Sequence, residues 1–459
     1  MTKTIELIND RIKNNRARVV TAAEMTRIVR ESGPERAAEN VDVVTTGTFG
    51  AMCSSGAWLN FGHSDPPIRL SRVFLNDVEA YGGVAAVDAY LGATQASTKE
   101  GIEYGGAHVI EDLVSRKPVV LRGTSRGTDC YPRKSIRTEI TIDDLNQAVL
   151  SNPRNAYQRY NAAVNTSDKI LFTYMGKLLP RCGNVNFSGA GELSPLMNDP
   201  EFRTIGIGTK IFLGGGTGHV IGSGTQHSPE NGFATLMVQG DLKGMSREFL
   251  RAAVYHGYGC TLYVGIGIPI PVLDASVAAK AGIADEEIQV SLLDYSVPSR
   301  RRPALRKESY AELKSGSVEI NGRSVRTASL SSLYAARRIA GILKGWIESG
   351  AFLLNPAAEP LSLTGTAKPM VQKAPGGGRP SGGKRPVTPG SGFLTRDESL
   401  CHDCGACLAV CPSGVFRRDE DWKTSADVSL CTECGQCENA CPVGAIRLSR
   451  TTGRGARRA

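Results

Sequence analysis

The first 358 residues alternate between helical and extended hydrophobic periods. Thr21 and Glu24 stand three residues apart ahead of an apolar run, which predicts a capping box and an amphipathic helix that ends near Gly33. The β-branched segment 41–46 predicts a strand. Later segments predict strands at 234–238 and 260–265, and helices at 246–255 and 330–349. This alternation predicts an α/β fold for a glycine-rich large domain, and it leaves the strand order open.

The periodic pattern stops at residue 358. Residues 359–395 are rich in Gly, Pro, Ser and Lys and have few apolar side chains, which predicts a flexible linker with an average span of roughly 30 to 35 Å. Such a linker would let a following module move onto and off the large domain. We therefore predict a large domain at 1–358, a linker at 359–395, a cysteine-rich module at 396–449 and a basic, disordered tail at 450–459.

Eight of the twelve cysteines form two copies of the motif C-x2-C-x2-C-x3-C-P. In bacterial two-cluster ferredoxins with this spacing, the fourth cysteine of each run binds the other cluster. The module therefore resembles a small α+β ferredoxin domain with two 4Fe-4S clusters. Zinc is the alternative, but zinc ligands come as separated pairs, whereas four cysteines here crowd into eleven residues. The predicted ligands are Cys401, Cys404, Cys407 and Cys441 for one cluster, and Cys431, Cys434, Cys437 and Cys411 for the other.

Composition and charge exclude several classes of protein. No apolar run approaches the roughly 18 residues that cross a bilayer, and the N-terminus lacks the apolar stretch of a secretory signal, so we expect a cytoplasmic protein without a membrane partner. The net charge of +9 arises largely from ten basic residues in two runs without acids, at 366–390 and 447–459. The rest of the chain is close to neutral and has no RNA-binding aromatic motif or zinc-finger spacing. Nucleic acid is therefore not an expected partner.

Residues 45–56 place Cys53 in a segment of Gly, Ser and Thr that follows a predicted strand. Small neighbours leave the sulfur accessible, and their backbone amides can lower the thiol pKa or bind an oxyanion or carboxylate. The alternative is a buried cysteine that behaves as a small apolar residue. Composition alone does not decide between these two interpretations.

Residues 122–134 place four basic side chains around Cys130. Positive potential favours the thiolate, which makes Cys130 the stronger candidate nucleophile, although Asp129 acts in the opposite direction. The alternative is a basic surface loop with an incidental cysteine. The basic residues are Arg122, Arg126, Arg133 and Lys134.

Residues 205–227 contain many glycines, including Gly215 and Gly216, together with His219 and His227. The backbone here can approach a ligand carboxylate or another backbone segment closely. A Walker motif and a helix-opening G-x-G-x-x-G motif are both missing, so nucleotide binding is not indicated. Each histidine is a candidate for proton transfer or for a structural hydrogen bond.

The proline-containing loop 60–69 combines His63, Asp65 and Arg69. Arg69 is a candidate for bidentate binding of a carboxylate, and His63 is a candidate for proton transfer. A rigid turn with a surface histidine is the alternative. Cys182 and Cys260 have unremarkable neighbours, and we assign them structural roles.

Three segments carry a resemblance to a known family: TTGTFGAMCSSGAWLNFGHSDPP at 45–67, GTDCYPR at 127–133 and GGGTGHVIGSGTQHSP at 214–229. Here the chain resembles the homocysteine-biosynthesis family of anaerobic microbes, the L-aspartate semialdehyde sulfurtransferases, and the likeness covers essentially residues 5–358. The resemblance implies a sulfur-carrying cysteine and an accompanying ferredoxin-type partner. Cys130 and Cys53 occupy the matching segments. The chain leaves no clear length for the paired CBS-type regulatory modules of some relatives, so nucleotide regulation is not expected.

The resemblance implies an enzyme that incorporates sulfide sulfur into the aldehyde of L-aspartate semialdehyde. An aldehyde and sulfide yield a thiol only with loss of water and gain of two electrons, which two 4Fe-4S clusters passing one electron each can deliver. The expected partners are these small molecules and a low-potential electron donor, and the chain is compatible with a homo-oligomer. Two alternatives are an iron-sulfur oxidoreductase acting on another carbonyl or thiol substrate, and a non-catalytic sulfur carrier.

We hypothesise that Cys130 carries a persulfide while Cys53 assists the transfer or resolves the disulfide. Arg126 and Arg133 would also favour the thiolate form of Cys130. The candidates for proton transfer are His63 and His219. The candidates for binding the substrate are Arg69, Arg126, Arg133, Gly215 and Gly216.

Overall fold

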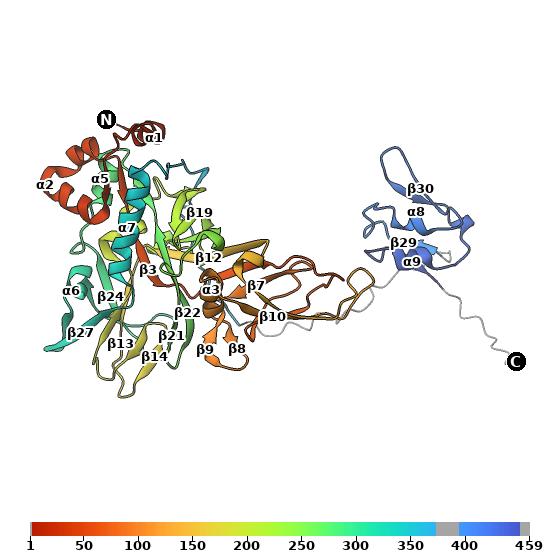
Figure 1. Cartoon of the computed structure of the whole chain (residues 1–459), viewed down its shortest axis with the longest axis horizontal. Coiled ribbons are helices and arrows are strands. Elements are labelled where there is room, and N and C mark those ends of the chain that lie inside the picture. The colour runs from red at the N-terminus through yellow and green to blue at the C-terminus, as the bar shows by residue number, and fades with distance from the viewer. Residues whose placement is uncertain (1, 373–393, 450–459) are drawn as a thin grey trace. The chain divides into compact units, whose positions relative to one another are not determined.

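The computed structural model describes residues 2–372 and 394–449 and divides the chain into a large unit, Met1–Pro369, and a small unit, Met370–Ala459. Strands dominate the large unit, and helices cover parts of its sheets (Figure 1). The fold is thus mixed α/β with many strands and few helices. Within the described ranges, no helix is both long and apolar enough to cross a membrane.

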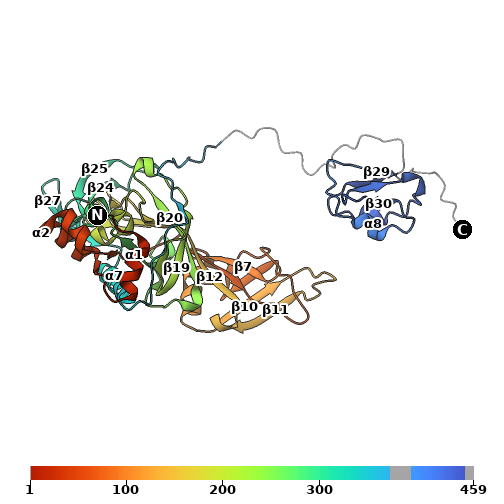
Figure 2. The same cartoon turned by 90° about the horizontal axis from the view of Figure 1, so that it is seen from above.

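A nine-stranded antiparallel sheet forms the centre of the large unit (Figure 2). Its longest strand, β12 (Gln147–Tyr157), pairs with β4 (Gly56–Asn60) on one side and with β20 (Thr235–Asp241) on the other. The remaining strands are β21 (Leu250–Tyr255), β22 (Gly259–Gly267), β18 (Lys210–Leu213), β19 (Gly216–Ser223) and β7 (Asp88–Gly92), with β3 (Thr48–Ala51) paired to β22.

Two six-stranded sheets flank this centre. One is antiparallel, in the order β11 (Ser135–Ile140), β10 (Val119–Thr124), β5 (Arg72–Leu75), β6 (Val78–Ala80), β8 (Ala96–Ser97) and β9 (Gly101–Gly105). The other is mixed, in the order β25 (Ala304–Ser309), β24 (Gln289–Asp294), β13 (Asn161–Val164), β16 (Val185–Phe187), β27 (Arg323–Ser329) and β26 (Ser317–Ile320).

Smaller sheets complete the large unit. They are β1 (Val19–Thr21), β2 (Val43–Thr45) and β23 (Pro269–Pro271); β14 (Leu171–Thr173) and β15 (Gly176–Leu178); and β17 (Gly206–Ile207) and β28 (Glu359–Pro360). The α-helices are α1 (Ile5–Lys13), α2 (Ala22–Asn40), α3 (Gly106–Val114), α4 (Pro195–Asn198), α5 (Ala275–Ala281), α6 (Tyr310–Lys314) and α7 (Leu333–Glu348). Short 3-10 turns occupy Ile142–Asp144, Gly191–Leu193, Pro229–Asn231 and Leu242–Gly244.

Helix α7 is amphipathic and packs on the central sheet with one face. Its buried residues recur at three- and four-residue spacing, so they form one apolar stripe along the helix. Ile339, Leu343 and Ile347 of this stripe join Phe212 and Phe249 of the central sheet region in one buried cluster. The apolar face of the helix thereby covers the sheet, and its polar face is exposed.

Most of the predicted elements are confirmed, and one is wrong. The Thr21–Glu24 capping box opens α2, and at Gly33 (φ 79°, ψ 160°) the backbone leaves helical geometry, so the first helical segment ends there as predicted and a second one follows from Pro34. The predicted helix at 246–255 is instead strand β21, whose residues pair with β22 from Leu250 to Tyr255. Here pairing with a neighbouring strand outweighs the local helical period.

The boundary of the large unit also needs correction. Residues 359 and 360, assigned to the linker by composition, form β28 and pair with β17. Leu361 is 5% exposed and belongs to the main apolar core, and His227 Nε2 lies 3.0 Å from the carbonyl oxygen of Ser362. The central part of the predicted linker, 373–393, and the predicted tail, 450–459, lie outside the described residues.

The small unit is built from two similar halves. Each half contains a short helix, α8 (Ala406–Val410) or α9 (Gln436–Ala440), and a turn of cysteines. Two antiparallel strand pairs complete it: β29 (Leu394–Arg396) with β32 (Ile446–Leu448), and β30 (Phe416–Arg418) with β31 (Thr424–Ala426), with a 3-10 turn at Val428–Leu430. Because Leu394 is buried in the core of this unit, the unit begins slightly before residue 396.

Replacing Leu361 with Ala should destabilise the large unit by about 2 to 3 kcal/mol, because a buried leucine is truncated and a cavity remains. Thermal unfolding of the full chain, followed by far-UV circular dichroism, measures the change. Leu363 is the matched control, since it is 54% exposed and its replacement with Ala should leave the transition almost unchanged. Equal effects of the two substitutions would contradict the corrected boundary.

Candidate active site

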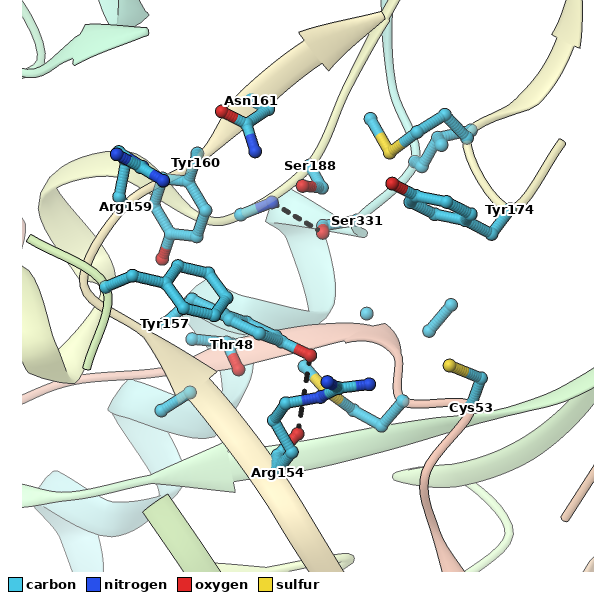
Figure 3. A pocket seen from close by; sticks show the side chains of 18 of the residues that line it. Thr48, Cys53, Arg154, Tyr157, Arg159, Tyr160, Asn161, Tyr174, Ser188 and Ser331 are labelled. Carbon is cyan, nitrogen blue, oxygen red and sulfur yellow. Dashed lines mark hydrogen bonds between the residues drawn. The ribbon is translucent and has the colours of Figure 1, made fainter. Parts of the chain in front are cut away.

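A cavity of about 420 Å³ opens in the large unit where the central sheet meets the mixed six-stranded sheet (Figure 3). Residues of β3, β12, β13 and β21 form part of its wall, and residues of several loops, among them those that follow β3, β16, β24 and β27, form the rest. Cys53 is one of the lining residues, and its sulfur points into the cavity. This position favours a reactive Cys53 over the alternative of an inert, fully buried cysteine.

The turn that carries Cys53 is fixed by a buried side chain of β12. The Asn152 amide donates a hydrogen bond to Ser55 Oγ at 3.0 Å, and the Ser54 hydroxyl donates to Asn152 Oδ1 at 3.3 Å. Asn152 is fully buried. The two serines that follow Cys53 in sequence therefore hold the turn, while the cysteine itself stays half-buried and accessible from the cavity.

The cavity wall is positively charged. Arg154 and Arg159 both line it, and among its lining residues, all of which belong to the described part of the chain, there is no Asp or Glu. Arg159 donates to the carbonyl oxygen of Asn231 and lies over the ring of Phe233. A cavity with cationic and without anionic side chains is suited to an anionic ligand.

Tyrosine hydroxyls gather near the Cys53 sulfur. Burial raises the pKa of Tyr157 and of Tyr255, and the negative charge of a Cys53 thiolate adds to both shifts. The hydroxyls of Tyr255 and Tyr263 lie 2.8 Å apart, and Tyr263 donates onward to the carbonyl oxygen of Leu330 at 2.8 Å. Burial therefore favours the protonated form of these phenols, and Tyr157 donates its proton to the carbonyl oxygen of Arg154 at 3.4 Å.

Cys130 lies in a different setting, at the tip of the hairpin that joins β10 to β11. Two backbone hydrogen bonds between Thr128 and Tyr131 close a tight turn around it, and its side chain is exposed. The ring of His63 stacks on that of Tyr131 at 6.0 Å. Arg133 donates to the carbonyl oxygen of Asp65. The structure thus brings Cys130, His63 and Arg133 into one exposed cluster.

The structure does not bring Cys130 and Cys53 together. Strand β4 begins at Gly56, next to the Cys53 turn, and ends at Asn60, from which the chain continues toward His63. At about 3.3 Å per residue this strand alone spans about 13 Å. In both overall views the β10–β11 hairpin lies away from β24, which borders the cavity (Figures 1 and 2). Within the described residues, Cys130 does not line the Cys53 cavity.

Five other predicted site residues do not line this cavity, as far as the described residues show. His219 is exposed on β19, and Arg69 and Arg126 are exposed as well. A Cβ on Gly215 would lie 3.0 Å from Ser246 Cβ, and one on Gly216 would lie 2.6 Å from the carbonyl oxygen of Gly244. These positions require glycine because another backbone segment packs against them. The sequence had left this packing role open as the alternative to ligand binding.

Sequence reasoning missed Arg154 and the tyrosines of the cavity. The available signal was the segment 152–161, in which two arginines and two tyrosines interrupt an otherwise predictable strand. What the sequence does not reveal is that β12 is bulged there, and that the bulge directs these side chains into the cavity. Bulges are frequent beside active sites for this reason.

The small unit brings repeated cysteines close together in two groups. Burial raises the pKa of Cys437, and nearby charges on Cys411 and Cys431 raise it further. Burial likewise raises the pKa of Cys407, with added effects of Cys401 and Cys404. The proximity of Cys411 to the second run of cysteines agrees with the crossed ligand sets that the spacing predicts.

The backbone of the small unit also suits iron-sulfur ligation. Gly405 and Gly435 adopt the left-handed conformation immediately before the short helices. Backbone amides point at sulfur atoms, with Val415 N 3.4 Å from Cys411 Sγ and Ala445 N 3.2 Å from Cys441 Sγ. Among the described residues, no three potential ligands converge on a single metal ion. In a 4Fe-4S cluster each thiolate binds a different iron atom, so its ligands need not converge in that way.

The cavity cysteine and the cysteine-rich unit together define a thiol-bearing protein with a dicluster ferredoxin-type domain. A family model described as "Homocysteine biosynthesis enzyme, sulfur-incorporation" matches residues 17–354, and a model of a 4Fe-4S dicluster domain matches residues 393–442. Since the first match covers well over half of the chain, the chain belongs to the homocysteine biosynthesis family.

Two relatives of this chain are named for an enzymatic activity. The chain is 58% identical over 370 residues to the L-aspartate semialdehyde sulfurtransferase of Methanosarcina acetivorans, covering 81% of this chain and 74% of the relative. It is 55% identical over 388 residues to the protein of the same name from Methanocaldococcus jannaschii, covering 81% and 75%. A 34-residue segment is 47% identical to the iron-sulfur subunit of the Methanosarcina acetivorans enzyme, covering 7% of this chain and 26% of that subunit.

A bulky neutral maleimide should label Cys130 faster than Cys53 in the folded, cluster-loaded chain. Cys130 is exposed at a turn, whereas Cys53 is reached only through the cavity. Anaerobic labelling followed by peptide mass spectrometry gives the two rates. Cys260 is the control, because its buried thiol should react only after unfolding. Faster labelling of Cys53 would contradict the described positions.

Replacing Arg396 with Gln should lower the reduction potential of the cluster bound by the Cys401 set. The Arg396 guanidinium donates to Cys401 Sγ at 3.2 Å, and hydrogen bonds and positive charge at a ligating sulfur stabilise the reduced cluster. An anaerobic redox titration followed by electron paramagnetic resonance measures the potential. The exposed Arg417, replaced in the same way, is the control; equal potentials for all three proteins would refute this role of Arg396.

Proposed function

We propose that this chain incorporates sulfide sulfur into L-aspartate semialdehyde and forms homocysteine. The observation that carries the proposal is the position of Cys53 in a cavity with two arginines and no acidic lining residue in the described chain. Family membership supports the proposal, and so do the names of two relatives that are more than half identical to this chain. A thiol next to a cationic surface is suited to the transfer of sulfur to an aldehyde that carries a carboxylate.

The overall reaction consumes electrons. An aldehyde, hydrogen sulfide, two electrons and two protons give a thiol and water. A persulfide forms from a thiolate and hydrosulfide with release of two electrons and a proton; the two clusters, when oxidised, would accept these electrons, one each, and the proton goes to water. Delivery of the outer sulfur as a thiol then consumes four electrons and four protons. The net demand is therefore again two electrons, and a source of low-potential electrons must be available to the site.

The positions of the two cysteines indicate different tasks. Cys53, inside the cavity, is the cysteine that delivers sulfur to the aldehyde. Cys130, exposed on its hairpin, is the cysteine that takes up sulfur from the donor. Arg126 and Arg133 place positive charge on the same hairpin, and the ring of His63 stacks on Tyr131 there. Attack of the Cys53 thiolate on a Cys130 persulfide leaves a Cys130 thiolate and a Cys53 persulfide, with no change in electron count.

Transfer between these cysteines requires that the hairpin bearing Cys130 approach the cavity of its own chain or of a second chain. The two cases are distinguishable, because only the second allows two different single-cysteine variants to complement each other. A homo-oligomer in which the hairpin of one protomer serves the cavity of another is compatible with the exposed position of Cys130.

The eight cysteines of the small unit would hold two 4Fe-4S clusters, with Cys401, Cys404, Cys407 and Cys441 at one and Cys431, Cys434, Cys437 and Cys411 at the other. Bound clusters supply single electrons at low potential. The large unit contributes the rest: it binds the aldehyde and holds the sulfur in the cavity that Cys53 lines.

The purified, cluster-loaded chain should form homocysteine from L-aspartate semialdehyde under anaerobic conditions, only when both sulfide and a low-potential reductant are present. Mass spectrometry detects the product. Cys53→Ala should abolish formation without changing iron content, whereas Cys182→Ala, a substitution outside the cavity and the hairpin, should retain it. Failure of the wild-type chain with reducible clusters would reject this reaction and favour another substrate or a carrier role.

Radioactive sulfide shows the order in which the two cysteines carry the sulfur. In Cys53→Ala with oxidised clusters and no added reductant, labelled persulfide should accumulate on Cys130. In Cys130→Ala, label on Cys53 and homocysteine formation should both fall strongly. If mixing these two variants restores part of the turnover, the transfer takes place between chains. Full labelling of Cys53 without Cys130 would refute the proposed order.

A further inference from the structure

Arg154 lies at a distortion of the central sheet. The register of β12 against β20 shifts between Asn152 and Asn155 and again between Asn155 and Tyr157, so β12 contains extra residues at these points. Ala156, in the second shift, has a φ of +47°. A bulge of this kind changes the direction of neighbouring side chains. Here it directs the Arg154 side chain into the cavity that contains Cys53 (Figure 3).

The guanidinium of Arg154 has an unsatisfied donor. Its Nε atom is buried and has no hydrogen-bond partner among the described residues. No carboxylate of the described chain forms an ion pair with Arg154, and none lines the cavity. A buried donor on a cation is costly unless it is paired, so this group is set to accept an anion from outside. Arg159 differs, because it is exposed and already donates to the carbonyl oxygen of Asn231.

The backbone of Arg154 is fixed relative to the sulfur. Its N–H donates to Asn152 Oδ1 at 3.0 Å, and its carbonyl oxygen accepts hydrogen bonds from the Ser54 and Tyr157 hydroxyls, both at 3.4 Å. Ser54 directly follows Cys53 in sequence. The same asparagine that holds the Cys53 turn therefore also holds the residue that bears the unpaired guanidinium. Arg154 and Cys53 are thus positioned by one set of hydrogen bonds.

We infer that Arg154 binds the carboxylate of the aldehyde substrate and makes this site selective for aldehydes that carry a carboxylate. The inference rests on the proposed function for the identity of the substrate. A guanidinium binds a carboxylate through two parallel hydrogen bonds, and Nε can supply one of them. In L-aspartate semialdehyde three carbon–carbon bonds separate the carboxylate carbon from the aldehyde carbon, so a carboxylate held at Arg154 leaves the aldehyde free to reach a sulfur nearby.

The cavity distinguishes the two charged groups of this substrate. Its polar lining includes Asn161, Ser188 and Gln226, which offer neutral oxygen atoms to an ammonium group, but no carboxylate among the described residues. Loss of the carboxylate from a ligand should therefore weaken binding more than loss of the amino group. This order is a property of the wild-type chain and needs no mutation to be measured.

The test is equilibrium binding to the full, cluster-loaded chain by anaerobic calorimetry with three unreactive alcohols. L-Homoserine carries both charged groups, 4-hydroxybutyrate lacks the amino group, and 3-amino-1-propanol lacks the carboxylate. Wild type should bind L-homoserine most tightly and 3-amino-1-propanol about 10- to 100-fold more weakly, with 4-hydroxybutyrate between them. An order in which 3-amino-1-propanol exceeds 4-hydroxybutyrate would overturn the inference.

Arg154→Gln should weaken L-homoserine binding by about 10- to 100-fold and leave 3-amino-1-propanol binding nearly unchanged. Arg154→Lys keeps the charge but loses the planar guanidinium, so its affinity for L-homoserine should lie between those of Arg154→Gln and wild type. Arg251→Gln, at an exposed position of β21, is the matched control for loss of one positive charge. Circular dichroism and cluster absorbance confirm folding of each variant. Retained preference for L-homoserine in both Arg154 variants would overturn the inference.

Turnover separates this inference from the proposed function. With L-aspartate semialdehyde, Arg154→Lys should raise KM by more than it lowers kcat, because the lost contact is present already in the bound substrate. If wild type selects carboxylate ligands through Arg154 but forms no homocysteine, the proposed reaction fails and the carboxylate site stands. If homocysteine forms with the KM of both Arg154 variants unchanged, the reaction stands and the assignment of Arg154 fails.

Discussion

The hydrogen bonds of the buried Asn152 side chain join the bulge of β12 to the turn that carries Cys53. Its amide nitrogen donates to Ser55, and its oxygen accepts from Ser54 and from the backbone of Arg154. Because Asn152 is completely buried, each of these contacts replaces water that it gave up on folding. A strand of the central sheet, the turn that carries Cys53 and the residue that carries the cavity guanidinium are therefore all held by this one side chain.

The central sheet also explains why the two cysteines differ. Strand β4 starts beside the Cys53 turn and leads away from the cavity toward the loop that packs on the Cys130 hairpin. A paired strand is stiff, so the sheet keeps an exposed thiol and a cavity thiol apart in the same unit. An exposed thiol can meet a sulfur donor, whereas a cavity thiol can hold reactive sulfur away from bulk water. Each position suits one half of a sulfur-transfer sequence and not the other.

Sequence reasoning succeeded where function depends on local spacing. The capping box at Thr21 is local, and so is the spacing of the cysteine runs from Cys401 and Cys431. It failed where tertiary contacts decide. Gly216 is required because the backbone at Gly244 packs against it, which composition cannot distinguish from a ligand site. The sequence did not predict a role for Arg154, because its position depends on a register shift between β12 and β20. A register shift between two strands cannot be recognised from the sequence of one of them.

The electrostatics of the cavity follow from what it must hold at once. A substrate carboxylate and a sulfur nucleophile are both anions, and two anions in one cavity repel each other unless positive charge or hydrogen-bond donors lie nearby. Arg154 supplies the positive charge, and it has no competing carboxylate among the described residues of the wall. Burial raises the pKa of Tyr157, so this phenol keeps its proton, which it donates to the carbonyl oxygen of Arg154 at 3.4 Å (Figure 3). A cavity built in this way holds the carboxylate and the thiolate side by side without needing a buried acid, and an acidic residue in its wall would remove the charge that makes this possible.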